Sequence, residues 1–151
     1  MDLSYHLLLK TYHCRGDKIM PTLFTKIIKG EIPCHKIMED DKYFAFLDIQ
    51  PINPGHTLVV AKKEVDYIFD LDDPLLAGLI LFAKKVAGPI QKAMKCQRVG
   101  IIVAGLEVPH AHVHLVPIIK TSDLSFANAK PTSHDELAKV AEKIRSHIKN
   151  K

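Results

Sequence analysis

Three histidines at alternate positions are the residues in this chain most suited to chemistry. The stretch 108–118 reads VPHAHVHLVPI and contains His110, His112 and His114. Alternation of apolar and polar residues is typical of a half-buried strand, on which residues i, i+2 and i+4 share one face. An imidazole carries polar nitrogens that need partners when it is buried, so three neighbouring rings are poor material for a core. The spacing therefore indicates a chemical role.

Two kinds of chemistry fit such a row of rings. Histidines at i and i+2 can reach one metal ion, with a further ligand from elsewhere, but the outer rings of a row are too far apart to converge on it easily. Alternatively, a neutral imidazole is a competent nucleophile at phosphorus near pH 7, and a neighbouring imidazolium can neutralise phosphate oxygens. His112, with a helper on either side, is then the natural attacking group. A strand with merely exposed histidines is the third interpretation, and the apolar residues that follow disfavour it.

Length and composition limit the remaining possibilities. The chain has 151 residues, 47% of them hydrophobic and 25% charged, which fits one soluble globular domain. No stretch approaches the roughly 18 uninterrupted apolar residues of a membrane helix. The net charge of +4 comes with scattered lysines, which suits a small anionic ligand better than a nucleic acid. Three widely spaced cysteines favour a reducing, cytoplasmic setting over a disulfide framework.

The chain is predicted to be an α+β domain built on a five-stranded antiparallel sheet with helices packed on it. Residues 1–19 lack the pattern of a secretory signal and are expected to form an extension to a domain that spans 20–151. Apolar residues surround the first half of the long helix, so we expect a partner subunit to cover its second side in a homodimer. The expected elements, in chain order, are a short helix within 22–33, strands at 36–39, 43–49 and 56–62, a helix at 73–96, strands at 98–104 and 108–118, and a helix at 133–149.

The motif HAHVHLV matches the pattern His-x-His-x-His-x-x, with apolar residues at x. The chain therefore resembles the histidine-triad (HIT) family of nucleotide hydrolases and transferases, and in particular its nucleoside phosphoramidase (HINT-like) branch. Three further blocks occur in the order of the family: LFTKIIKGEIP, EDDKYFAFLDIQPINPGHTLVV and GLEVPH. The resemblance implies a HIT-like fold and action at the α-phosphate of a purine nucleotide or nucleotidyl substrate. We expect no cofactor and no metal, and the charge and composition described above predict no nucleic acid and no membrane as partners.

The resemblance also implies roles for individual residues. His112 is the implied nucleophile, which becomes nucleotidylated before water releases the nucleotide. His110 and His114 are its implied phosphate-binding and orienting neighbours, and His56, in NPGHTLVV, supports the nucleophile through the hydrogen-bond network. Asp48 is the acidic residue that accepts hydrogen bonds from the ribose hydroxyls. The residues implied for the base pocket, for which a core role is an equally good interpretation, are Phe24, Ile27, Ile32, Phe46, Leu47 and Ile49.

The chain departs from the family pattern at three places. Thr22 and Thr25 stand where many bacterial relatives have a Cys-x-x-Cys zinc pair, so that zinc is not expected. The Asn-rich phosphate loop and the Gln before the triad are missing, because Leu106 follows Ala-Gly, which makes a long polyphosphate substrate less attractive. Glu107 stands where phosphoramidases often place a Ser that contacts the leaving group, so leaving-group specificity stays open. The alternative function is a nucleotide-binding or partner-binding dimer with vestigial catalysis.

Overall fold

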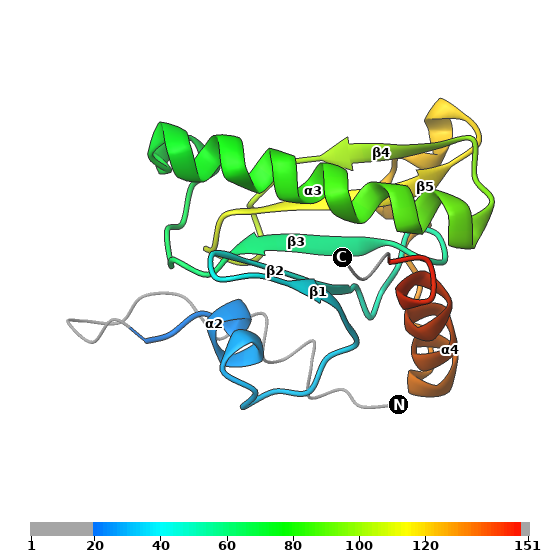
Figure 1. Cartoon of the computed structure of the whole chain (residues 1–151), viewed down its shortest axis with the longest axis horizontal. Coiled ribbons are helices and arrows are strands. Elements are labelled where there is room, and N and C mark those ends of the chain that lie inside the picture. Colours follow the sequence, from blue (N-terminus) through cyan, green and yellow to red (C-terminus); the bar gives the residue numbers. More distant parts are fainter. Residues whose placement is uncertain (1–19, 149–151) are drawn as a thin grey trace.

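Five antiparallel strands form one sheet, as predicted, and the structure gives their order as β1-β2-β3-β5-β4 (Figure 1). The computed structural model describes residues 20–148, so the predicted extension at 1–19 lies outside the described residues. The strands are β1 (Lys36–Glu39), β2 (Tyr43–Leu47), β3 (Thr57–Ala61), β4 (Arg98–Ile102) and β5 (His112–Ile118). Because β5 pairs with both β3 and β4, its histidines lie in the interior of the sheet.

The α-helices begin where the sequence places capping residues. They are α2 (Leu23–Ile28), α3 (Asp73–Met94) and α4 (His134–Arg145). The side chains of Thr22, Asp72 and Ser133 each accept a backbone N–H from the residue three positions further on, which satisfies one open donor of each first turn. Short 3₁₀ turns are η1 (Ile68–Asp70), η2 (Thr121–Asp123) and η3 (Phe126–Asn128). Within residues 20–148, no helix has the length and apolar character needed to cross a membrane.

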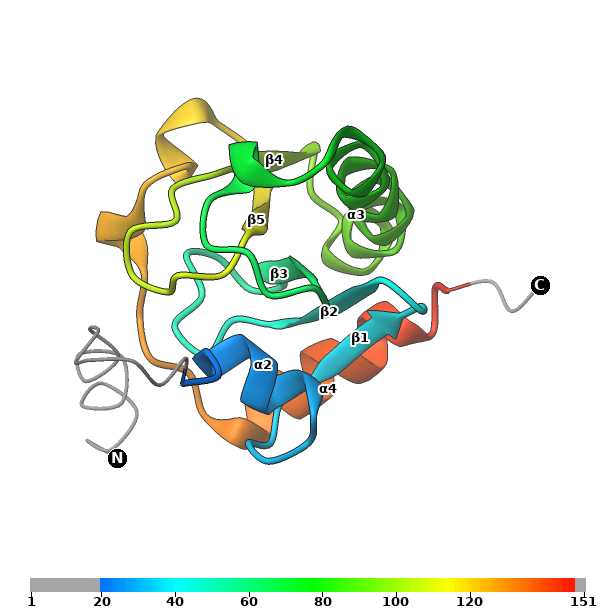
Figure 2. The ribbon, with the colours of Figure 1, turned by 90° about the vertical axis from the view of Figure 1, so that its left-hand side faces the viewer.

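The two faces of the sheet carry separate apolar clusters. Along β2, Ala45 and Leu47 belong to the larger cluster under α3 and α4, whereas Phe44 and Phe46 belong to the smaller one under α2. This division follows from the two-residue repeat of a strand, which sends neighbouring side chains to opposite faces. Figure 2, at a right angle to Figure 1, shows α3 and the opposite-face helix α2 separated by the strands. The smaller cluster lies beside the histidine strand.

The histidine strand begins later than predicted. β5 starts at His112, and His110 lies in the segment that precedes it. The backbone N–H of His110 is donated to the Val108 carbonyl at 2.8 Å, and the N–H of Ala111 to the Val65 carbonyl at 2.6 Å. These local bonds replace the regular hydrogen bonds of the sheet. His112 and His114 alternate along β5, whereas His110 lies before the strand and does not follow its alternation.

Candidate active site

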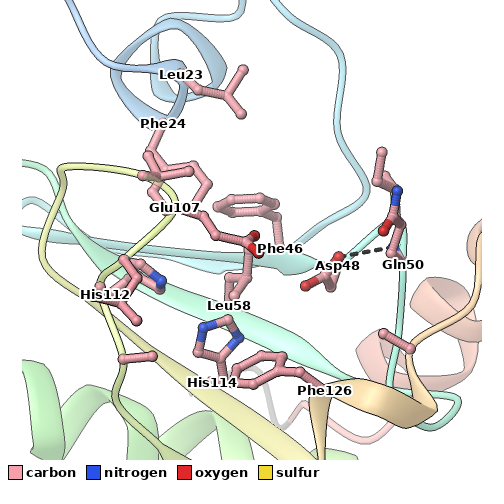
Figure 3. A pocket seen from close by; sticks show the side chains of 16 residues that line it. Leu23, Phe24, Phe46, Asp48, Gln50, Leu58, Glu107, His112, His114 and Phe126 are labelled. Carbon is pink, nitrogen blue, oxygen red and sulfur yellow. Dashed lines mark hydrogen bonds between the residues drawn. The ribbon is translucent and has the colours of Figure 1, made fainter. Parts of the chain in front are cut away.

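A cavity of about 290 Å³ opens beside the histidine strand, between α2, β2, β3, β5 and the segment 104–108 (Figure 3). Seven of the residues singled out from the sequence line it: Phe24, Phe46, Asp48, Ile49, Glu107, His112 and His114. Leu23, Leu58 and Phe126 also line it and were not singled out. Leu58 could have been found from its position two residues after His56, because alternate residues of an extended segment share a face. No local signal marks Phe126, which reaches the cavity from η3 and lies with its ring centroid 5.0 Å from that of His114.

Five singled-out residues lie outside the cavity lining. Ile27 and Ile32 pack in the smaller apolar cluster behind Phe24. Leu47, expected in the base pocket, lies instead in the larger core on the opposite face, because its neighbour Phe46 occupies the cavity side of β2. His56 and His110 are buried next to the cavity and contact its wall through hydrogen bonds.

The hydrogen bonds of His112 determine which of its nitrogens carries the proton. Nδ1 lies 2.6 Å from the backbone carbonyl oxygen of His110. A carbonyl only accepts, so Nδ1 must donate its N–H there, and in the neutral ring Nε2 keeps its lone pair. His112 lines the cavity with its ring edge-on to Phe24, at a centroid distance of 5.1 Å. The result is an unprotonated ring nitrogen, held by the backbone in one tautomer.

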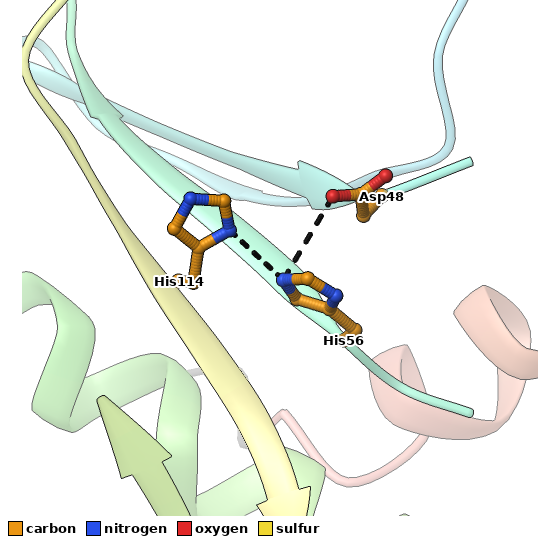
Figure 4. Close-up of side chains that lie close together, drawn as sticks. All are labelled: Asp48, His56 and His114. Atoms are coloured by element: carbon orange, nitrogen blue, oxygen red, sulfur yellow. Dashed lines mark hydrogen bonds and ion pairs between the residues drawn. The ribbon is translucent and has the colours of Figure 1, made fainter. Parts of the chain in front are cut away.

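A second chain of imidazoles runs from a loop to the cavity (Figure 4). His56 Nδ1 accepts the backbone N–H of Ile52 at 3.1 Å, so its Nε2 carries the proton and donates to Nδ1 of His114 at 3.0 Å. His114 therefore carries its own proton on Nε2. The turn before His56 depends on Gly55, whose φ is +92° and where a Cβ would lie 2.6 Å from Met94 Cγ.

His110 is held by a backbone carbonyl and a side-chain hydroxyl from two distant segments. Its Nε2 donates to the Ala61 carbonyl oxygen at 2.6 Å, which leaves Nδ1 to accept the Thr22 hydroxyl at 2.7 Å. Thr22 is 3.1 Å from the Thr25 hydroxyl, and Thr25 donates to the Glu64 carboxylate. This chain of contacts, from an exposed carboxylate through two hydroxyls to a buried ring, uses the two threonines that stand at the family's cysteine positions.

All four imidazoles resist protonation. Burial is the main cause in each case: it lowers the pKa of His110 and His112, and, with help from neighbouring histidines, it lowers that of His56 to about 4 and that of His114 to about 3. The rings are therefore neutral at pH 7. In the unliganded protein at pH 7 the row therefore offers a phosphate no imidazolium, because burial disfavours the charged form of each ring.

Asp48 is the singled-out carboxylate nearest to these rings. Burial raises its pKa to about 6, although the backbone N–H of Gln50, donated to Oδ1 at 2.8 Å, opposes the rise. Oδ2 lies 3.8 Å from His56 Nε2, but a neutral imidazole makes no ion pair. Asp48 thus has an oxygen available at the wall of the cavity.

Asp48, His56 and His114 form what we call the acid–imidazole cluster. One ligand atom from each lies within 4.8 Å of the others, which would suit a metal ion. The two facing ring nitrogens are 3.0 Å apart and share a proton, so a metal would have to displace that hydrogen bond. A metal ion here would be held by residues from three segments, and not by the His-x-His pair on one strand that the sequence suggested.

Comparison with known sequences identifies the family with which this geometry is shared. Residues 29–121 match the HIT domain family. The chain is similar to the HIT-like protein MJ0866 of Methanocaldococcus jannaschii, with 37% identity over 124 residues, 78% of this chain and 95% of that protein. It is also similar to the adenosine 5′-monophosphoramidase HNT1 of Saccharomyces cerevisiae, with 34% identity over 133 residues, 83% of this chain and 82% of that protein.

Solved structures agree with the sequence comparisons. A HIT-like protein from Bartonella henselae has a TM-score of 0.74 and 32% identity, covering 83% of this chain and 94% of its own. A Zn-bound histidine triad family protein from Mycobacterium smegmatis has a TM-score of 0.70 and 26% identity, covering 82% of this chain and 90% of its own. The arrangement of the sheet and helices is therefore shared with these proteins.

Proposed function

This chain belongs to the HIT domain family, and from that premise we propose that it hydrolyses or transfers a nucleoside monophosphate by way of a nucleotidylated His112. The observation that carries the proposal is the tautomer of His112: its Nδ1 is bound to a backbone carbonyl, and its Nε2 lone pair is available in a cavity. Nucleophilic catalysis needs such an unprotonated nitrogen at working pH.

The reaction divides into two displacements at the α-phosphorus. In the first, His112 Nε2 forms a bond to phosphorus, and the leaving group departs with the electron pair of its own bond and a proton from water. In the second, water attacks phosphorus and gives up one proton to the hydroxide left by the first step, while the Nε2–P bond breaks and its electron pair returns to the ring. The His110 carbonyl, 2.6 Å from Nδ1, stabilises the positive charge that the ring carries between the two steps. The net reaction consumes one water.

The nucleoside has a complementary place in the cavity. Phe24 and Phe46 present apolar rings in an edge-on pair with centroids 5.5 Å apart, which suits the faces of a purine. Asp48 offers an oxygen to the ribose hydroxyls, as the family resemblance implies. His114, with its proton on Nε2, is the donor for a phosphate oxygen, and His56 fixes that tautomer.

The substrate class draws on named relatives. Two fungal HNT1 proteins, from Saccharomyces cerevisiae and Candida albicans, are named adenosine 5′-monophosphoramidases, at 34% and 30% identity. We therefore favour a nucleoside phosphoramidate, with breakage of the P–N bond. The altered segment Leu106–Glu107 supports a second candidate, in which the cavity binds a nucleotide without turning it over. The acid–imidazole cluster supports a third, in which a metal ion takes part.

We also propose that two copies of the chain associate. β4 is the last strand of the sheet, and no strand among residues 20–148 pairs with its outer edge. Ile101 on that strand is 50% exposed, and Leu81 on the neighbouring α3 is 59% exposed. An open edge beside exposed apolar side chains is typical of an interface.

Cys34 and Cys96 are free thiols, which suits the reducing cytoplasmic setting that we expect.

The proposal is tested with adenosine 5′-monophosphoramidate as substrate. His112→Asn should lower kcat by about 10³-fold or more, because it removes the nucleophile while the ribose and base contacts remain. His147→Asn replaces an exposed histidine in the turn after α4; it is the matched control and should leave kcat unchanged. Rapid quenching of the wild type, followed by peptide mass spectrometry, should place the nucleotidyl adduct on His112.

Three results would contradict the proposal in different ways. An adduct on His110 or His114 would assign the chemistry to another ring. AMP binding without turnover of any phosphoramidate would favour the binding dimer. Loss of turnover in EDTA, restored by Zn²⁺, would favour a metal at the acid–imidazole cluster.

A further inference from the structure

The cavity has an unbalanced charge for a site that handles phosphate. Its described lining residues include two carboxylates, Asp48 and Glu107, and neither lysine nor arginine. The histidines in the wall contribute no positive charge at pH 7, because burial lowers the pKa of His112 and that of His114. A substrate therefore meets a negative field, apart from the N–H groups that the imidazoles can donate.

Glu107 is the carboxylate of the cavity that has no proposed contact with the base or the ribose. It lies between β4 and β5 on the exposed rim, and Figure 3 shows its side chain between His112 and Asp48. Among residues 20–148 it forms no hydrogen bond or ion pair. Its charge nevertheless reaches both neighbours: burial raises the pKa of Asp48 and lowers that of His112, and the charge of Glu107 adds to the first shift and opposes the second.

The leaving group is the part of a substrate that could face Glu107. Asp48 is assigned to the ribose, and Phe24 and Phe46 to the base, so the group beyond the phosphorus is the part left for the rim. An anionic leaving group such as pyrophosphate, a second nucleotide or sulfate would place like charges together with no lysine or arginine of the described cavity wall to separate them. A cationic leaving group would instead pair with a carboxylate that has no other partner.

Resting on the proposed attack at the α-phosphorus, we propose that the preferred substrate is a nucleoside phosphoramidate whose leaving amine carries a second, positively charged amine, and that Glu107 selects it. In the first displacement the P–N bond breaks, and its nitrogen leaves with the electron pair and takes one proton. The second amine stays an ammonium group throughout, and its charge is held by Glu107 in both the bound and the reacting state. Glu107 thus acts on specificity rather than on the nucleophile.

Three adenosine 5′-phosphoramidates of matched length test the proposal. Their leaving amines are 1,5-diaminopentane, pentylamine and 6-aminohexanoate, so the far end is cationic, neutral or anionic while the P–N bond is the same. For the wild type we expect kcat/KM to fall about three- to tenfold at each step in that order, the size of a solvent-exposed charge interaction. The differences should shrink as salt is raised, because screening weakens such interactions.

Variants assign the preference to one side chain. Glu107→Gln should bring the cationic and neutral substrates to within about twofold of each other, and Glu107→Lys should reverse the order of the cationic and anionic substrates. Glu142→Gln, which removes an exposed carboxylate from α4, is the matched control and should keep the wild-type order.

The outcomes separate this inference from the proposed function. Equal use of all three substrates by the wild type would overturn the role of Glu107 and leave hydrolysis by His112 standing. A wild-type preference for the cation that survives in Glu107→Lys would also overturn it. Failure to turn over any of the three would overturn the proposed function and this inference with it.

Discussion

Asp48→Asn should make the unliganded protein more stable at pH 7 and, at the same time, weaken its binding of a ribonucleotide. Burial raises the pKa of Asp48 from its ordinary value of 3.8 to about 6, so the native state carries a carboxylate that would be better solvated after unfolding. Asparagine has no charge to bury. Its Oδ1 still accepts the backbone N–H of Gln50, which Asp48 Oδ1 accepts at 2.8 Å.

The size of the effect follows from the two pKa values. A difference of about 2.2 between the native and unfolded states corresponds to about 3 kcal/mol at pH 7. The Asp48 side chain keeps 21% of its exposure, so water screens part of this, and we expect the variant to gain about 1–3 kcal/mol. Because the native pKa lies above the unfolded one, the wild type gains stability relative to the variant as the pH falls from 7 to 4. The advantage of Asp48→Asn should therefore disappear by about pH 4.

Urea unfolding of both proteins between pH 4 and pH 8 measures this difference. His56 and His114, whose pKa values burial lowers to about 4 and about 3, destabilise both proteins below pH 6.5, and their contribution cancels in the difference. Asp41→Asn, which removes an exposed carboxylate from the β1–β2 turn, is the matched control. An Asp48→Asn variant that is no more stable at pH 7, or whose gain is independent of pH, would refute the reasoning.

The same variant gives an independent kinetic result. If Asp48 binds the ribose, Asp48→Asn should raise KM for ribonucleotide substrates and narrow the preference over 2′-deoxy analogues. Loss of one or two charge-assisted hydrogen bonds costs about 1.5–3 kcal/mol. An unchanged ribose preference would show that Asp48 serves the structure alone.

Two further predictions concern the support of the site and its assembly. Thr22→Val removes the hydroxyl that donates to His110 Nδ1, and it should lower kcat about five- to thirtyfold with a smaller change in KM. Thr22→Ser keeps a hydroxyl and should keep kcat near the wild-type value. An equal loss of kcat in both variants would mean that packing, and not the hydrogen bond, matters. Leu81→Lys combined with Ile101→Lys should convert a dimer to a monomer in light-scattering measurements without lowering the melting temperature, because both side chains are already exposed in one chain; a wild type that is monomeric at micromolar concentration would contradict the interface.

Much of the architecture was determined by the sequence alone. The capping side chains of Thr22 and Ser133 mark helix starts because a polar residue before an apolar repeat satisfies open N–H groups of the first turn. Strands such as β2 and β3 follow from short runs of apolar, β-branched and aromatic residues bounded by turn residues, which is a local signal that needs no distant partner. Along any strand, side chains at every second position share a face. For the same reason the sequence places His112 and His114 on one face, and the structure has both in the cavity wall.

The sequence could not tell which face of a strand meets the cavity. Phe46 and Leu47 are equally apolar neighbours, and both were expected at the base, yet Phe46 lines the cavity and Leu47 lies in the core under α3 and α4. Which face of β2 meets the cavity depends on where the helices pack, and the alternation of side chains along the strand does not contain that information. Phe126 reaches the cavity from a turn after the histidine strand, where no pattern marks it.

The protonation of the histidines was decided by tertiary structure alone. His112 holds its proton on Nδ1 because the chain bends before β5 and presents the His110 carbonyl, and His110 is fixed in turn by Ala61 of β3 and by Thr22 ahead of α2. A sequence shows which nitrogens exist, but a tautomer depends on which donors and acceptors lie within about 3 Å. Those partners are up to 88 positions apart in the chain, and only the packing of the helix and the sheet brings them together.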